Sequence, residues 1–132
     1  MDIKEKAEMR YAQKVADLSK QFSKKVKTAA SVALQKETSN LFRHRHKKNH
    51  RLDVHRFNQV ISVDKDKLVA EVEGMTTYED FVNATLAYGC LPTVVPELKS
   101  ITVGGALSGI GIESSSFRYG LVHETVTEFD VL

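Results

Sequence analysis

The segment that decides the fold reads Thr102-Val103-Gly104-Gly105-Ala106-Leu107-Ser108-Gly109-Ile110-Gly111-Ile112-Glu113-Ser114-Ser115. It holds four of the seven glycines of the chain, mixed with hydroxyl and small apolar side chains. Both prolines, Pro92 and Pro96, come shortly before it and stiffen its approach, because proline fixes φ. Glycine lets a backbone come close to a ligand and present its N–H groups. We therefore predict a backbone cradle for a phosphate or pyrophosphate rather than an amphipathic helix.

The spacing of the glycines excludes two common nucleotide-binding motifs. The segment has the form GxxxGxG, whereas dinucleotide-binding βαβ units use GxGxxG, and no Gly-Lys-Ser/Thr follows as in a P-loop. A glycine cluster alone is equally typical of tight packing or turns. The hydroxyls of Thr102, Ser108 and 114–116 add donors, and these favour a ligand.

Composition places the chain among ordinary single domains or parts of domains. The 132 residues carry a net charge of +2, which does not point to nucleic acid, although 1–56 are basic and 64–132 acidic. Cys90 is the only cysteine, so an internal disulfide is excluded and a reducing compartment is expected. Residues 1–20 are charged throughout, and no apolar run reaches the roughly 18 residues of a membrane span. We expect a cytoplasmic protein, with peripheral membrane contact as an alternative.

Hydrophobic periodicity predicts the elements. Residues 2–27 form a helix, because apolar residues recur every three or four positions: Ile3, Ala7, Tyr11, Val15, Leu18, Phe22 and Val26. A short strand over 31–34, a strand-like stretch over 52–61 and a hairpin of 60–63 with 68–73 follow. Thr76 and Glu79 match a capping box that begins a second helix. Its expected buried face is Phe81, Val82, Leu86 and Tyr88, and its expected stop is Gly89.

The order of the elements indicates an α+β fold without regular βαβ alternation. Residues 122–132 read as a last strand with no polar tail, so we expect a C-terminally truncated domain from a longer protein.

Three further features have both a functional and a structural interpretation. The loop 36–43 contains Ser39, Asn40 and Leu41 and is a second candidate anion contact, or an ordinary surface loop. The basic run 43–51 is a solvated loop or a contact for nucleic acid or anionic lipid. Its histidines match no zinc signature, so no metal site is expected. Cys90 is expected to be structural rather than nucleophilic.

Two stretches resemble a known family. Leu91-Pro92-Thr93-Val94-Val95-Pro96-Glu97-Leu98 precedes Thr102-Val103-Gly104-Gly105, and Gly-Ile-Glu-Ser-Ser-Ser at 111–116 precedes Tyr119-Gly120-Leu121. This pattern resembles the PCMH-type FAD-binding domain of vanillyl-alcohol-oxidase-like enzymes, and within it the delta24-sterol reductase branch. The resemblance is best over 52–132.

The resemblance implies two small α+β subdomains with FAD between them. It makes residues 31–132 an incomplete FAD-binding domain without a substrate domain, and the helix that periodicity predicts then forms a separate N-terminal part, 1–30. It places FAD against Ser39, Asn40 and Leu41, against Pro96, and against every residue from Thr102 to Ser115. Because the loop before His44 has no histidine, FAD is expected to be noncovalent.

The same resemblance implies the chemistry and the partners. A flavin passes hydride at N5, while the protein orients the substrate. We expect an FAD-dependent oxidoreductase that reduces an alkene in a hydrophobic, sterol-like substrate with NADPH or another electron partner, or that oxidises an alcohol. The catalytic residues are not predicted, and nucleic acid is not an expected partner. The rival hypothesis is a noncatalytic binding module that uses 43–51, or a degenerate flavin fold.

Overall fold

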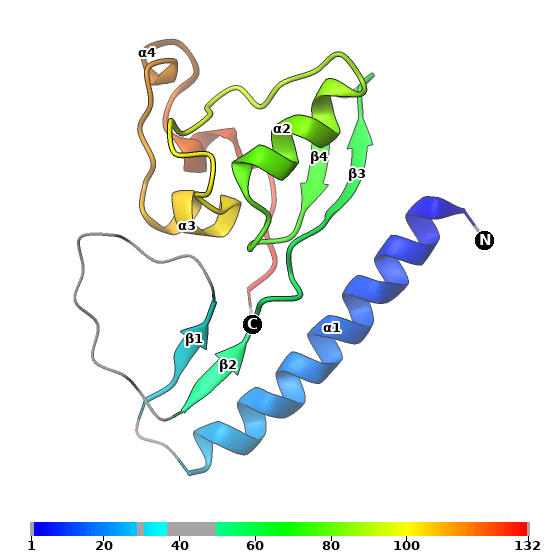
Figure 1. The fold of residues 1–132 in the computed structure, drawn as a ribbon, viewed down its shortest axis with the longest axis vertical. Helices are drawn as coiled ribbons and strands as arrows, with labels where there is room; N and C mark the ends of the chain where they lie inside the picture. Colours follow the sequence, from blue (N-terminus) through cyan, green and yellow to red (C-terminus); the bar gives the residue numbers. More distant parts are fainter. Residues whose placement is uncertain (1, 29–30, 37–49, 132) are drawn as a thin grey trace. The chain divides into compact units, whose positions relative to one another are not determined.

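A computed structural model describes residues 2–28, 31–36 and 50–131, which form two compact units, Met1–Phe57 and Asn58–Leu132 (Figure 1). Helices and strands are mixed in both units, which confirms the α+β class. The expected domains 1–30 and 31–132 stay a prediction. No helix in the described part of the chain is both long and apolar enough to cross a membrane.

The first unit begins with helix α1, Ile3–Val26, as the periodicity predicts. Asp2 caps it: its side chain accepts from the N–H of Ile3, and the Glu5 side chain accepts from the N–H of Asp2. Lys24 and Lys25 lie in the last turn, where they complement the helix dipole. Both ends of the helix are therefore stabilised by residues next to them in the sequence.

The apolar stripe of α1 is half-buried only in its middle. Tyr11 packs edge-on against Phe57, with ring centroids 6.3 Å apart, and Leu18 is also half-buried. Ile3 and Val26 at the two ends are 84% and 48% exposed. The reason is length: 24 helical residues span about 36 Å, whereas the three-residue strands of this unit span roughly 10 Å.

These strands are β1, Ala33–Gln35, and β2, Arg51–Asp53, and they pair in parallel with Leu34 opposite Leu52. Leu52 and Val54 are buried. The predicted strand-like stretch over 52–61 is wrong in its middle, because the N–H of Phe57 bonds to the carbonyl of Val54 and turns the chain.

The second unit starts with a hairpin of β3, Val60–Asp64, and β4, Val69–Val72, as predicted. The Asp64 carboxylate accepts from the N–H groups of Asp66 and Lys67 and so closes the turn. Leu68 completes the turn with φ of 56°.

Helix α2, Tyr78–Leu86, packs against β3 (Figure 1). The predicted cap is wrong by one residue, since Thr77 is the N-cap and accepts from the N–H of Asp80. The predicted buried face is also wrong in part. Tyr78 and Thr85 are buried, whereas Leu86 and Tyr88 are about half exposed. Gly89 follows the helix with φ of 69°, a conformation that glycine adopts without strain.

The glycine-rich segment contains a short helix, α3, Val103–Ser108, where we expected irregular backbone. Helix α4, Ser116–Tyr119, and the 3₁₀-helix η1, Val122–Thr125, follow. The predicted strand over 122–132 is wrong for the described residues, in which η1 and irregular backbone take its place. The core of this unit comprises Tyr78, Val94, Ala106 and Val122.

Candidate functional site

The candidate site is built where residues 74–79 run antiparallel to 99–104. The N–H of Tyr78 bonds to the carbonyl of Ile101 at 2.9 Å, and that of Val103 bonds to the carbonyl of Thr76 at 2.9 Å. Thr77 and Thr102, the N-caps of α2 and α3, form the bridge between them. The pairing thus fixes the start of the glycine-rich segment against the start of α2.

The glycines of the segment face the chain's own atoms at very short range. A Cβ on Gly104 would lie 2.7 Å from the carbonyl oxygen of Gly74, and one on Gly111 would lie 3.0 Å from a methyl carbon of Val122. A Cβ on Gly105 would lie 2.9 Å from the Thr102 hydroxyl. These three glycines therefore allow close packing between segments of the same unit.

The first N–H groups of α3 are all engaged inside the chain. Gly104 donates to the carbonyl of Gly74 at 2.8 Å, and Gly105 donates to the Thr102 hydroxyl at 3.2 Å. Ala106 donates to the carbonyl of Thr102 at 2.9 Å. The N–H groups at the start of α3 therefore hold the segment in place, and any N–H groups open to a ligand must lie further along the segment, after α3.

Past α3, the backbone turns and offers N–H groups without an internal acceptor. The N–H of Gly111 bonds back to Ala106, and its carbonyl accepts from Val122. In the described part of the chain, the N–H groups of Ile112, Ser114 and Ser115 have no hydrogen-bond acceptor. Ile112 and Ser114 are exposed, so both N–H groups lie on residues at the surface.

The hydroxyl groups of the segment also divide into those bonded inside the chain and one without a partner among the described residues. Ser108 donates to the carbonyl of Gly104 at 2.7 Å, and Ser115 donates to that of Thr93 at 2.8 Å. Ser116 accepts from the N–H of Glu113 at 3.0 Å. Among the described residues, nothing bonds to the Ser114 hydroxyl, which joins the N–H groups as a donor.

Tyr78 is a component of this region that the sequence analysis did not single out. Its side chain is 4% exposed, and burial together with the charge of Glu113 raises the pKa of its phenol. The phenol therefore stays protonated near neutral pH. Its position directly after two consecutive threonines, at the start of a helix, is the only sequence signal for it.

The predicted contacts fall into three groups. Ser39, Asn40 and Leu41 lie outside the described residues. Pro96 is buried, and Thr102 to Gly111 form α3 and the turn after it. Ile112, Glu113, Ser114 and Ser115 form the donor-bearing strip. The structure thus brings the second and third groups together within one unit.

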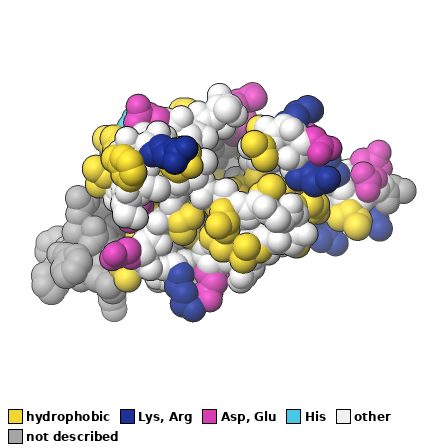
Figure 2. All heavy atoms as spheres, turned by 90° about the horizontal axis from the view of Figure 1, so that it is seen from above, with side chains coloured by type: hydrophobic (Ala, Val, Ile, Leu, Met, Phe, Trp, Pro, Cys, Tyr) yellow, Lys and Arg dark blue, Asp and Glu magenta, His cyan; other side chains and the backbone are white. Residues whose placement is uncertain are grey.

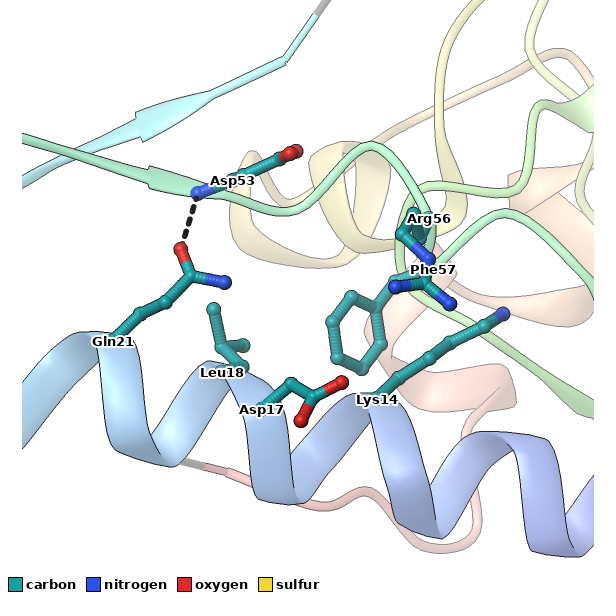
Figure 3. A pocket seen from close by; sticks show the side chains of 7 residues that line it. All are labelled: Lys14, Asp17, Leu18, Gln21, Asp53, Arg56 and Phe57. Atoms are coloured by element: carbon teal, nitrogen blue, oxygen red, sulfur yellow. Dashed lines mark hydrogen bonds between the residues drawn. The ribbon is translucent and has the colours of Figure 1, made fainter.

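The first unit has a pocket of its own, of about 80 Å³, between α1 and the chain after β2 (Figure 3). Lys14 and Arg56 line it, as do Asp17 and Asp53, so the formal charges of its lining balance. The Lys14 ammonium lies 6.0 Å from the ring centroid of Phe57. The described residues hold no cluster of three or more metal-ligating side chains, here or elsewhere.

Residues 9–132 match the family model described as an FAD binding domain. The chain belongs to this family of FAD-binding domains. FAD is therefore the cofactor of the domain, as the cradle and its flanks led us to expect.

Curated relatives agree with the family. Over 81 residues, 61% of the chain, it is 35% identical to the Delta(24)-sterol reductase of Pisum sativum. Over 88 residues, 67% of the chain, it is 33% identical to the Delta(24)-sterol reductase of Homo sapiens. It is also 30% identical over 118 residues to Cytokinin dehydrogenase 10 of Oryza sativa subsp. japonica.

The matched regions cover 14%, 17% and 20% of these three proteins. The domain thus belongs to an oxidoreductase family, and the resemblance to its sterol reductase branch is confirmed. No solved structure matches the chain.

Proposed function

We propose that this chain holds FAD noncovalently as the FAD-binding portion of a flavin-dependent oxidoreductase. The main supporting observation is the strip after α3: among the described residues, the N–H groups of Ile112, Ser114 and Ser115 and the Ser114 hydroxyl have no hydrogen-bond partner. Such groups suit the oxygens of a pyrophosphate, because a phosphate accepts several hydrogen bonds at once. The family match supplies the identity of the cofactor.

The glycines before the strip serve this site by fixing its position. Contact of Gly104 with Gly74 and of Gly111 with Val122 holds α3 and the turn in place before a ligand arrives. A preorganised site loses less entropy on binding. We infer that Ser39, Asn40 and Leu41 provide a second contact, and the absence of histidine from 36–43 supports noncovalent attachment.

We further infer the reaction class from the relatives. A bound flavin supplies hydride transfer at N5, and the surrounding chain orients the reacting partners. Similarity to the Delta(24)-sterol reductases supports alkene reduction on an apolar, sterol-like substrate, and we infer NADPH or another donor as the electron source. Similarity to the cytokinin dehydrogenase supports the alternative, in which the protein oxidises its substrate.

Exposed apolar side chains next to the strip support an apolar substrate. Ile112 is 71% exposed, and Phe117, only five residues further on, is 91% exposed. Yellow apolar side chains also reach the surface on the face shown in Figure 2. Apolar side chains that gather on a surface mark contact sites, and we infer that Ile112 and Phe117 belong to one.

The experiment is an FAD titration of the 132-residue protein, followed by quenching of flavin fluorescence. Ser114→Glu places a carboxylate among the donors and is expected to weaken FAD binding at least tenfold, because the pyrophosphate is also negative. Ser100→Glu introduces the same charge at an exposed position before α3 and is expected to change affinity less than twofold.

Precipitation with acid distinguishes the mode of attachment, since noncovalent FAD stays in the supernatant. A chain with native circular dichroism that takes up no FAD would refute the proposed function. Equal effects of the two glutamate variants would instead refute the placement of the site.

A further inference from the structure

Charge is strongly separated between the two units. Residues 1–57 hold 15 of the 19 Lys and Arg residues but only 6 of the 17 Asp and Glu residues. Residues 58–132 hold the other 4 cations and 11 acids. The net charge of +2 thus combines a basic unit of +9 with an acidic unit of −7. The excess positive charge that could attract an extended anionic surface therefore lies in the first unit.

Within that unit, the described cations concentrate on one side of α1 and its C-cap. We call this set the cationic row: Lys6, Arg10, Lys20, Lys24 and Lys27. Their spacings fit the three- and four-residue steps of one helix face, with Gln13 and Asp17 filling the gap. All five cations are exposed, on the side of α1 away from half-buried Tyr11 and Leu18.

Within the described residues, the charge of the row is not neutralised by ion pairs. In the described part of the chain, none of its five side chains has a carboxylate partner. Asp17, which lies between Arg10 and Lys20 on this face, accepts a hydrogen bond from Gln13 at 3.0 Å. Three of the four cations of the second unit behave differently: Lys65 and Lys67 pair with Asp66 and Asp64, and Lys99 pairs with Glu79 at 2.6 Å.

We propose that the cationic row of α1 binds the surface of an anionic lipid membrane. The helix is about 36 Å long, so a flat charged surface can meet cations at both ends of the row at once. Met9 lies within the row and is 60% exposed, which provides an apolar side chain for the headgroup region.

Two features of the row favour lipid over nucleic acid. It contains no aromatic side chain on which a base could stack, and Gln13 is its only amide. Nucleic-acid readers use such groups for base edges and ring faces. The row instead combines point charges with one flexible apolar side chain, Met9, and such clustered cations are attracted to anionic headgroups.

The test is sedimentation of the whole chain with vesicles of phosphatidylcholine containing about a third phosphatidylserine. Each Lys or Arg near such a surface is worth about 1 kcal/mol, or roughly fivefold in affinity. The double variant Lys20→Gln/Lys24→Gln is therefore expected to bind roughly 25-fold more weakly. The matched control Lys65→Gln/Lys67→Gln loses the same charge from the second unit and is expected to change affinity less than twofold.

A gain-of-binding variant keeps the proposal testable if the lysine variants fold poorly. Glu8 pairs with Lys4 beside the row, so Glu8→Gln is expected to strengthen vesicle binding roughly two- to fivefold. Binding should also weaken as salt rises, because exposed charges are screened.

Three results would overturn the proposal. The first is an equal loss of vesicle affinity in the two double lysine variants. The second is equal binding of the original protein to vesicles of phosphatidylcholine alone. The third is tighter binding to single-stranded DNA than to the anionic vesicles at the same salt concentration. None of these readouts depends on FAD, so failure here leaves the proposed function standing.

Discussion

Replacing Gly104 by alanine tests the close contact that places the glycine-rich segment. The new Cβ would lie 2.7 Å from the carbonyl oxygen of Gly74 and 3.2 Å from its Cα, both backbone atoms. Neither can move aside as a flexible side chain would, because the N–H of Gly104 bonds to that same oxygen at 2.8 Å. The two backbones must separate for alanine to fit.

The magnitude follows from three contributions to the free energy of unfolding. Overpacking costs about 1–3 kcal/mol, and stretching the hydrogen bond to Gly74 costs about 0.5–1.5 kcal/mol. Alanine recovers about 0.4–1 kcal/mol by restricting the unfolded chain. The central values of these ranges sum to a loss of about 2 kcal/mol in the free energy of unfolding of Gly104→Ala.

The matched control is Gly74→Ala, on the other side of the same contact. Its Cβ would lie 3.9 Å from the Cα of Gly104, which is an ordinary van der Waals distance. Urea unfolding followed by far-ultraviolet circular dichroism gives both free energies, and the control is expected to stay within about 1 kcal/mol of the original protein. If Gly104→Ala is as stable as Gly74→Ala, the inferred backbone contact is refuted.

Two further substitutions test α2. Thr77→Ala removes the acceptor for the Asp80 N–H and should cost about 1 kcal/mol in urea unfolding, whereas Thr77→Ser should cost little; equal losses would refute the assigned cap. Tyr78→Phe tests pH dependence. Burial and Glu113 raise the phenol pKa above its ordinary value of 10.0, so the folded state holds this proton more tightly and stability falls as pH rises above about 10. The variant should lose that part of the alkaline decline, and an unchanged decline would contradict the assignment.

Local signals were sufficient for α1 and for the β3–β4 hairpin. The cap of α1 uses Asp2 and Glu5, three residues apart, and the turn of the hairpin is closed by Asp64 with its own neighbours. All of these contacts lie within a few positions of one another, so the sequence contains both partners of each. Propensity and spacing therefore predict such elements directly.

The start of α2 shows that local sequence signals are not always sufficient to identify the N-cap of a helix. Thr76 has Glu79 three positions later, and Thr77 has Asp80, so both threonines fit a capping pattern. The choice is made by a distant residue: the Thr76 hydroxyl donates to the carbonyl of Gln59, and Thr76 is completely buried. No pattern within 76–80 contains that information.

Helix α3 could not be predicted for a related reason. Each glycine costs a helix about 1 kcal/mol relative to alanine, and α3 has two among six residues. Tertiary hydrogen bonds compensate, since the N–H groups of Val103 and Gly104 donate to the carbonyls of Thr76 and Gly74, 27 and 30 positions earlier. The same distance explains why a cradle for a ligand and a contact with the chain itself look alike in the sequence.

The predicted cofactor segment therefore combines two physical roles that mutation can separate. From Gly104 to Gly111 the glycines contact Gly74 and Val122, so substitutions there change stability first and FAD affinity as a consequence. At Ile112 and Ser114 the N–H groups have no acceptor in the described chain, so we expect a charged side chain placed there, as in Ser114→Glu, to change FAD affinity at constant stability. When FAD affinity is plotted against the free energy of unfolding, variants at Gly104 to Gly111 should lie on a sloping line, because affinity falls with stability. Variants at Ile112 and Ser114 should lie on a vertical line, because affinity changes while stability does not. A single common line would mean that one packing role accounts for the whole segment.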